Sequence, residues 1–127
     1  MPVFELDFSL TQGSFSVEMT ERSDARALAL FGPSGSGKTT VIEAIAGLRT
    51  PERGTIAIGE HLLFARDRHV NLSARDRRVG YVPQDVLLFP HLDVRQNVLY
   101  GATRGNAGSE EHLDALIELL ELTGLMN

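Results

Sequence analysis

Two stretches near the N-terminus alternate between apolar and polar residues, which is the period of a β-strand with one buried face. They span residues 3–10 and 14–19, and a short link containing Gly13 separates them. The apolar residues of the first stretch are Phe4, Leu6, Phe8 and Leu10. The pattern predicts an antiparallel hairpin with one face in water.

The next segments show the patterns of a buried strand and of an amphipathic helix. Residues 27–31 are continuously apolar and precede Gly-Pro, as expected of a strand buried on both faces. Residues 38–48 place apolar side chains at helical spacing, and Gly47 indicates where that helix ends. With short strands predicted at 55–58 and 79–82, this order of elements indicates an α/β fold.

The rest of the chain carries weaker patterns. Residues 61–74 are polar and mixed, so we predict mostly loop there, and we expect the charges of residues 66–78 to be solvated. Residues 93–100 are predicted to form a helix. A further helix is predicted to begin after Ser109 as N-cap and to end before Gly124 as C′ residue.

Length and charge exclude several classes of protein. The chain has 127 residues, enough for a domain with a real core, and 12 basic against 17 acidic residues give a net charge of −5. That balance argues against nucleic-acid binding through bulk positive charge. No cysteine is present, which excludes disulfides, thiolate zinc sites and a cysteine nucleophile. The longest apolar run, at 27–31, is far shorter than the roughly 18 residues of a membrane span.

One glycine-rich motif carries chemistry, and it lies between the predicted buried strand and the predicted helix. Glycines let the backbone turn tightly and approach a phosphate. Its residues, which match the phosphate-binding pattern G-x-x-x-x-G-K-[ST], are Gly32, Pro33, Ser34, Gly35, Ser36, Gly37, Lys38 and Thr39. We expect the backbone N–H groups from Gly35 to Thr40 to converge on phosphate oxygens at the N-terminus of the helix.

Two side chains of this motif are suited to a nucleotide. Lys38 is expected to place a positive charge against the β- and γ-phosphates, and the Thr39 hydroxyl to ligate a bridging Mg²⁺. The alternative, an ordinary Gly/Ser turn between strand and helix, does not explain Lys38 and Thr39 at the start of the helix. The motif alone leaves kinases, GTPases and ATPases open.

Further motifs narrow the class. The predicted helix ends in Ala-Gly-Leu at 46–48, and a Pro-x-x-Gly turn at 51–54 leads to a predicted strand. Gln84 follows a later predicted strand, and Leu-Phe-Pro-His at 88–91 and Val-Arg-Gln-Asn-Val at 94–98 come after it. In combination these motifs resemble the ATP-binding subunits of ABC transporters over essentially the whole chain. Among these subunits the sequence looks most like the molybdate importer subgroup, and importers of other solutes share most of the motifs.

The resemblance implies a P-loop NTPase core that is incomplete here, so that the chain is the N-terminal part of a larger ATP-binding domain. It implies an antiparallel β-region at 1–25, a P-loop to Gln-loop part at 26–85 and the start of a helical subdomain at 86–127. The implied cofactors are ATP and Mg²⁺, with Lys38 and Gln84 as catalytic residues and with Thr39 and Gln84 as metal ligands.

The resemblance also implies partners and a location. Transporter permease subunits would contact residues after Gln84, and a second ATPase subunit would complete a homodimer or pseudo-dimer. No nucleic acid is implied. The complete protein would be cytoplasmic and peripheral on the inner face of the cell membrane, where it would couple ATP to solute import.

Gln84 and one phenylalanine are the remaining candidates for the site. A neutral amide at Gln84 can ligate Mg²⁺ and orient water without repelling phosphate, and the alternative is a polar residue that merely follows a strand. In the family an aromatic side chain from the N-terminal β-region stacks on adenine, and here Phe15 is the candidate, with Phe8 second. The alternating pattern favours core packing for both. Pro83 stands where the family commonly has an aromatic residue.

Parts that the family uses for hydrolysis have no match in the sequence: an LSGGQ-type signature, a Walker B strand ending in Asp, and a catalytic Glu. We therefore expect negligible hydrolysis by these residues alone, and poor stability because a strand at 27–31 would expose an apolar edge. Two alternatives stay open: a non-hydrolysing nucleotide-binding module, and another P-loop enzyme such as a small-molecule kinase.

Overall fold

The alternating residues at the N-terminus form two antiparallel strands, β1 (Phe4–Gln12) and β2 (Phe15–Ser23), which confirms the predicted hairpin. The structure is a computed structural model that describes residues 2–85, 87–100 and 110–126. Gly13, in the turn, has a φ of +62°, a left-handed conformation that glycine adopts without strain.

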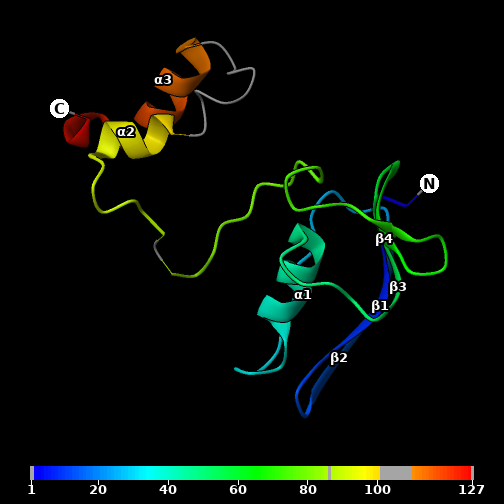
Figure 1. Ribbon diagram of the computed structural model, residues 1–127. Helices are drawn as coiled ribbons and strands as arrows, with labels where there is room; N and C mark the ends of the chain where they lie inside the picture. Colours follow the sequence, from blue (N-terminus) through cyan, green and yellow to red (C-terminus); the bar gives the residue numbers. More distant parts are fainter. Residues whose placement is uncertain (1, 86, 101–109, 127) are drawn as a thin grey trace. The chain divides into compact units, whose positions relative to one another are not determined.

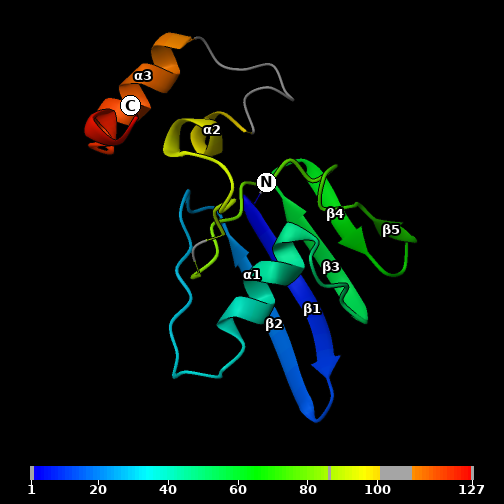
Figure 2. The same ribbon diagram turned by 60° about the vertical axis from the view of Figure 1, so that its left-hand side comes forward.

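Three more strands extend this hairpin into one sheet. They are β3 (Arg53–Ile58), β4 (His61–Ala65) and β5 (Val70–Asn71), and the strand order is β2-β1-β3-β4-β5 with every pairing antiparallel (Figure 2). The predicted strand at 55–58 is confirmed. The prediction of mostly loop at 61–74 was wrong for β4 and β5, because a short apolar run pairs with β3 before the charged turn begins.

Helix α1 (Lys38–Ala46) confirms the predicted helix and covers the apolar face of the sheet (Figure 2). Val41 and Ala44 of this helix share a buried core with side chains from the sheet. The fully buried members from the sheet are Leu6, Ile56 and Phe64. Because α1 and the sheet bury one common set of apolar groups, packing determines which face of the helix lies against the sheet.

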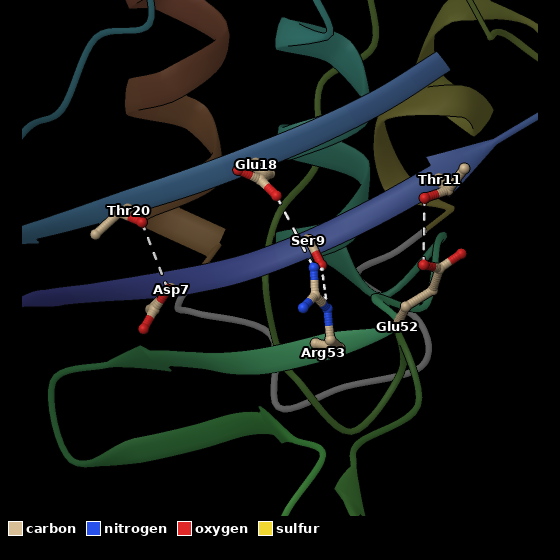
Figure 3. A network of polar contacts seen from close by, with 7 residues as sticks. All are labelled: Asp7, Ser9, Thr11, Glu18, Thr20, Glu52 and Arg53. Carbon is tan, nitrogen blue, oxygen red and sulfur yellow. Dashed lines mark hydrogen bonds and ion pairs between the residues drawn. The ribbon is translucent and has the colours of Figure 1, made fainter. Parts of the chain in front are cut away.

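The opposite face of the sheet carries polar side chains that contact one another across the strands (Figure 3). Arg53 of β3 donates from Nε to the Ser9 hydroxyl at 3.2 Å, and its guanidinium lies 3.9 Å from a Glu18 carboxylate oxygen. The Thr11 hydroxyl donates to Glu52 at 3.2 Å. This is the wet face that the alternation predicts.

The strands predicted at 27–31 and 79–82 do not form, so those two predictions were wrong. Phe31 is 93% exposed and Val82 is 91% exposed. A strand buried on both faces needs hydrogen-bonding neighbours, and none of the strands within the described ranges pairs with either segment. Both segments are therefore extended chain with irregular structure.

The structure divides into two compact units, Met1–Tyr81 and Val82–Asn127. The second unit contains α2 (Val94–Leu99), α3 (Glu110–Leu119) and the short 3-10 helix η2 (Thr123–Leu125). Figure 1 labels α2 and α3 and colours the C-terminal end of the chain red. The predicted N-cap Ser109 lies outside the described residues. In the part of the chain that is described, no helix has the length and apolar character needed to cross a bilayer.

The end of α3 differs from the prediction. Glu121, not Gly124, adopts the left-handed conformation after the helix, with a φ of +57°. The Leu122 N–H donates to the Ile117 carbonyl at 2.9 Å and the Glu121 N–H donates to the Glu118 carbonyl at 3.0 Å. These two bonds are those of a Schellman motif, so a glutamate serves as C′ residue here and Gly124 lies in η2.

Candidate functional site

The glycine-rich loop opens directly onto the N-terminus of α1. Ser36 donates its backbone N–H to the Pro33 carbonyl at 3.2 Å, which closes a turn. Gly35 has a φ of +79° and Gly37, the N-cap residue, a φ of +94°. No side chain among the described residues caps this end of α1. The first-turn N–H groups and the positive end of the helix dipole therefore face the loop, as an anion site requires.

Strand β2 comes close to the loop at Gly37. A Cβ on Gly37 would lie 2.6 Å from Val17 Cγ2 and 3.3 Å from two ring carbons of Phe15. Only glycine fits this position, both for its left-handed φ and for the space that the β2 side chains leave. Nothing in the sequence signalled the role of Val17, because its contact depends on how β2 passes the helix.

Lys38 lies folded across its own loop. Its ammonium group donates to the carbonyls of Gly32 at 2.8 Å and Pro33 at 2.7 Å, and to the Ser36 hydroxyl at 3.3 Å. These acceptors hold the positive charge over the turn of the glycine-rich loop. An arriving anion would exchange neutral carbonyl partners for charged oxygens, which form stronger hydrogen bonds.

The structure brings Phe15 to the loop and keeps Phe8 away from it. Phe15 is 40% exposed beside Gly37, so the expectation that it packs in the core was wrong. Phe8 is 3% exposed and belongs to the core, as the alternation predicts. Of the two rings, only that of Phe15 is open to solvent, and it alone lies beside the glycine-rich loop.

The candidate metal ligands lie in different units. Thr39 is exposed in the first turn of α1, and Gln84 is exposed in the second unit. Among the described residues no three His, Asp or Glu side chains cluster as a metal site. A hydroxyl and an amide oxygen nevertheless fit Mg²⁺, which takes oxygen ligands and uses few protein groups when phosphates supply the rest.

Arg77 overturns the expectation that the charges of residues 66–78 are all solvated. Its side chain is 6% exposed, and burial lowers the pKa of its guanidinium below the usual value. The guanidinium donates to the backbone carbonyls of Ala44 at 2.7 Å and Ile45 at 2.9 Å, in the last turn of α1. The sequence offers no signal for this, because Arg75 and Arg78, which are exposed, look the same.

In the second unit one amide organises the loop before α2. Asn97 accepts the Phe89 N–H at 2.9 Å and donates to the carbonyls of Leu92 at 3.0 Å and Asp93 at 2.9 Å. Asp93 caps α2, and its carboxylate accepts the Gln96 N–H at 2.7 Å in a capping box. A groove of about 500 Å³ is lined mainly by the apolar side chains Leu88, Phe89, Val94, Val98, Leu122 and Leu125.

The sequence profile of the ABC transporter family matches residues 14–127. The chain belongs to the ABC transporter family. The family match does not favour the alternative of a small-molecule kinase.

Relatives within the family agree with this assignment. The chain is 42% identical over 123 residues to the molybdenum import ATP-binding protein ModC of Vibrio parahaemolyticus, a match that covers 97% of this chain and 29% of that protein. It is 39% identical over 126 residues to ModC of Salmonella typhimurium, covering 98% and 35%. With ModC of Rhodospirillum rubrum the identity is 38% over 127 residues, covering 98% and 34%. The chain therefore spans about a third of the length of these curated relatives.

Proposed function

We propose that this ABC family chain carries the phosphate-binding half of an ATP site, and that the whole protein couples ATP binding and hydrolysis to solute import. The observation that carries the proposal is the glycine-rich loop, which holds the Lys38 ammonium over the uncapped N-terminus of α1. Molybdate is the proposed solute, since three of the relatives are named molybdenum import proteins.

Each candidate residue has a role in this proposal. Backbone N–H groups between Gly35 and Thr40 bind phosphate oxygens, and Lys38 neutralises the β- and γ-phosphates. Thr39 and Gln84 supply oxygen ligands to Mg²⁺, which neutralises phosphate charge when bound. Phe15 stacks on adenine, because its exposed ring lies against the start of the phosphate-binding helix.

The proposed architecture follows the family. Residues 26–85 belong to a P-loop NTPase core, residues 1–25 to an antiparallel β-region, and residues 86–127 to a helical subdomain. The whole protein works as a dimer of ATPase subunits on the inner face of the membrane, and the apolar groove after Gln84 receives a permease subunit. A groove lined mainly by carbon suits such a contact, because burial of apolar surface drives association.

Calorimetric titration with Mg·ATP tests the nucleotide site. Lys38→Ala removes a charged donor from the phosphates and is expected to weaken binding by about 10- to 100-fold. Arg68→Ala, which removes an exposed charge in the turn between β4 and β5, is the matched control and should leave the dissociation constant unchanged. Equal affinity of Lys38→Ala and the unsubstituted protein would contradict the role of Lys38.

A further inference from the structure

Arg77 is a buried cation whose partners are neutral. Besides the two α1 carbonyls, its Nε donates to the Leu72 carbonyl at 2.9 Å and its Nη2 to the Asn71 side chain at 3.0 Å. The ion pairs found among the described residues do not include Arg77. A charge is costly to bury without a carboxylate, so a guanidinium with only neutral acceptors points to a specific positional task.

The two carbonyls in α1 explain why a cation suits this place. The last turn of a helix leaves its carbonyls without intrahelical partners, and the C-terminal end of the helix dipole is negative. Arg77 donates to the Ile45 carbonyl and adds a second donor to the Ala44 carbonyl, which also accepts the Gly47 N–H at 3.2 Å, and it places its positive charge at that end. It therefore acts as a C-terminal cap of α1. Arg77 lies 33 residues after Ala44 and 32 residues after Ile45, so the cap comes from a distant part of the chain.

Gly47 leaves the space that Arg77 occupies. A Cβ on Gly47 would lie 2.7 Å from Arg77 Nε and 3.0 Å from the Cα atom of Ala74. Gly47 also has a φ of +83°, which ends α1. The end of α1 and the segment after β5 are therefore complementary in shape, because Gly47 has no side chain where the Arg77 guanidinium lies.

This contact is one of two directional links between α1 and other parts of the first unit. The other runs through Arg49, which pairs with Glu43 of α1 and donates to the Gln12 side chain of β1 at 2.6 Å. Within the described residues, the hydrogen bonds that α1 accepts from side chains beyond residues 32–49 all come from Arg77. Apart from these two links, the helix packs on the sheet through apolar groups such as Val41 and Ala44. Apolar contact is non-directional and permits small shifts of a helix along its axis, whereas two hydrogen bonds to consecutive carbonyls do not.

We propose that Arg77 is a positioning residue for phosphate binding: it fixes the C-terminal turn of α1 and thereby sets the place of Lys38 and Thr39 at the other end. The helix has nine residues, so its ends lie only about 12–14 Å apart at 1.5 Å per residue, and a shift at one end moves the other. This inference rests on the proposed nucleotide site.

Calorimetric titration with Mg·ATP on Arg77→Met and Arg77→Lys tests the inference, because it measures the dissociation constant and the binding-competent fraction separately. Arg77→Met removes the charge and every donor, and is expected to raise the dissociation constant about tenfold. Arg77→Lys keeps the charge and can reach one or two carbonyls, so it should recover part of the affinity, with a rise of about threefold. Arg75→Met, the exposed matched control, should bind like the unsubstituted protein.

A purely structural role gives a different result. It would lower the fraction of protein that binds while the dissociation constant of the remaining fraction stays the same in both variants, and that outcome overturns the inference. If Arg77→Met does not fold, Arg77→Lys decides by the same criterion. Absence of binding by the unsubstituted protein would contradict the proposed nucleotide site itself, which separates the two failures.

Discussion

Strands β1 to β5 and the segment at 27–31 all contain apolar residues, yet their backbones differ in how they are paired. Every strand of the sheet has an antiparallel neighbour that lies nearby in the chain, with a hairpin or a short connection between many of them. Residues 27–31 have no strand beside them among the described residues, and Phe31 points a nearly bare ring to solvent. Apolar content alone therefore does not make a strand in this protein.

The difference shows which part of the first unit is self-sufficient. The antiparallel sheet and α1 supply the buried core around Leu6, Ile56 and Phe64, and Leu30 of the first irregular segment packs against its edge. From the two irregular segments, Leu28, Leu30, Val79 and Tyr81 line a hollow of about 220 Å³ beside α1. The phosphate-binding loop lies at the boundary between these regions: its helix packs on the finished sheet, and its preceding segment does not belong to any sheet.

The largest expected effect compares one phenylalanine from each region. Phe64→Ala removes a ring that is 2% exposed and should destabilise the first unit by about 3–5 kcal/mol, through lost burial and a cavity. Phe31→Ala, the matched control with a ring that is 93% exposed, should change stability by less than about 0.5 kcal/mol. Urea unfolding measures both. Equal losses would mean that residues 27–31 contribute to the folded core.

A second comparison, of two glycines with positive φ, separates the cost of crowding between strands from the cost of the left-handed conformation. Gly54 has a φ of +95°, and a Cβ there would lie 1.9 Å from the Asp7 carbonyl oxygen and 2.7 Å from Phe8 Cα on the neighbouring strand. Gly13 has a φ of +62° with open space around it. Gly54→Ala should therefore destabilise the sheet by about 2–4 kcal/mol, through strain and overpacking together.

Gly13→Ala is the matched control for that substitution. It should destabilise by only about 1–2 kcal/mol, from the left-handed conformation alone. The excess loss in Gly54→Ala measures how closely β1 and β3 approach. Identical unfolding midpoints for the two variants would show that the sheet relaxes to admit the methyl group, and that its pairing is looser than that of a packed core.

Local patterns predicted the parts of the fold that depend on local pairing. The alternation at residues 3–10 and 14–19, the period of residues 38–48 and the glycine at 47 all lead to elements that the structure contains. The motif likewise identified the glycine-rich loop, because its pattern combines backbone freedom with a lysine at the start of a helix.

The features that depend on distant partners were not predictable in the same way. A continuous apolar run at 27–31 indicates burial, but only a neighbouring strand turns burial into a sheet. The strand at 61–65 was not predicted, because the charged residues that follow it made the whole segment look like a loop. Arg77 resembles Arg75 and Arg78 in sequence, and only the path of the chain past the end of α1 makes it a buried cap.

The loop before α2 extends the comparison to the second unit. There one side chain supplies the backbone hydrogen bonds that a neighbouring strand supplies in the sheet. Asn97 accepts the Phe89 N–H and donates to the Leu92 and Asp93 carbonyls, so Asn97→Ala should lower the free energy of opening this loop by about 1–3 kcal/mol. Hydrogen exchange of the Phe89 amide measures this opening directly. Asn97→Asp keeps the acceptor for that amide but loses all three donated bonds and turns a carboxylate oxygen toward the carbonyls of Phe89, Leu92 and Asp93, so its effect should be at least as large.

Arg95→Ala is the matched control on α2, since Arg95 is exposed and makes none of these contacts, and it should leave the exchange of the Phe89 amide unchanged. If Asn97→Ala also leaves it unchanged, the ring of Phe89, which lies 4.4 Å from the Tyr100 ring between centroids, holds the loop instead. The distinction matters for the proposed permease contact. A loop held by one amide presents Leu88 and Phe89 to the groove in a fixed arrangement, and its loss would alter the shape of the groove while leaving the sheet and α1 intact.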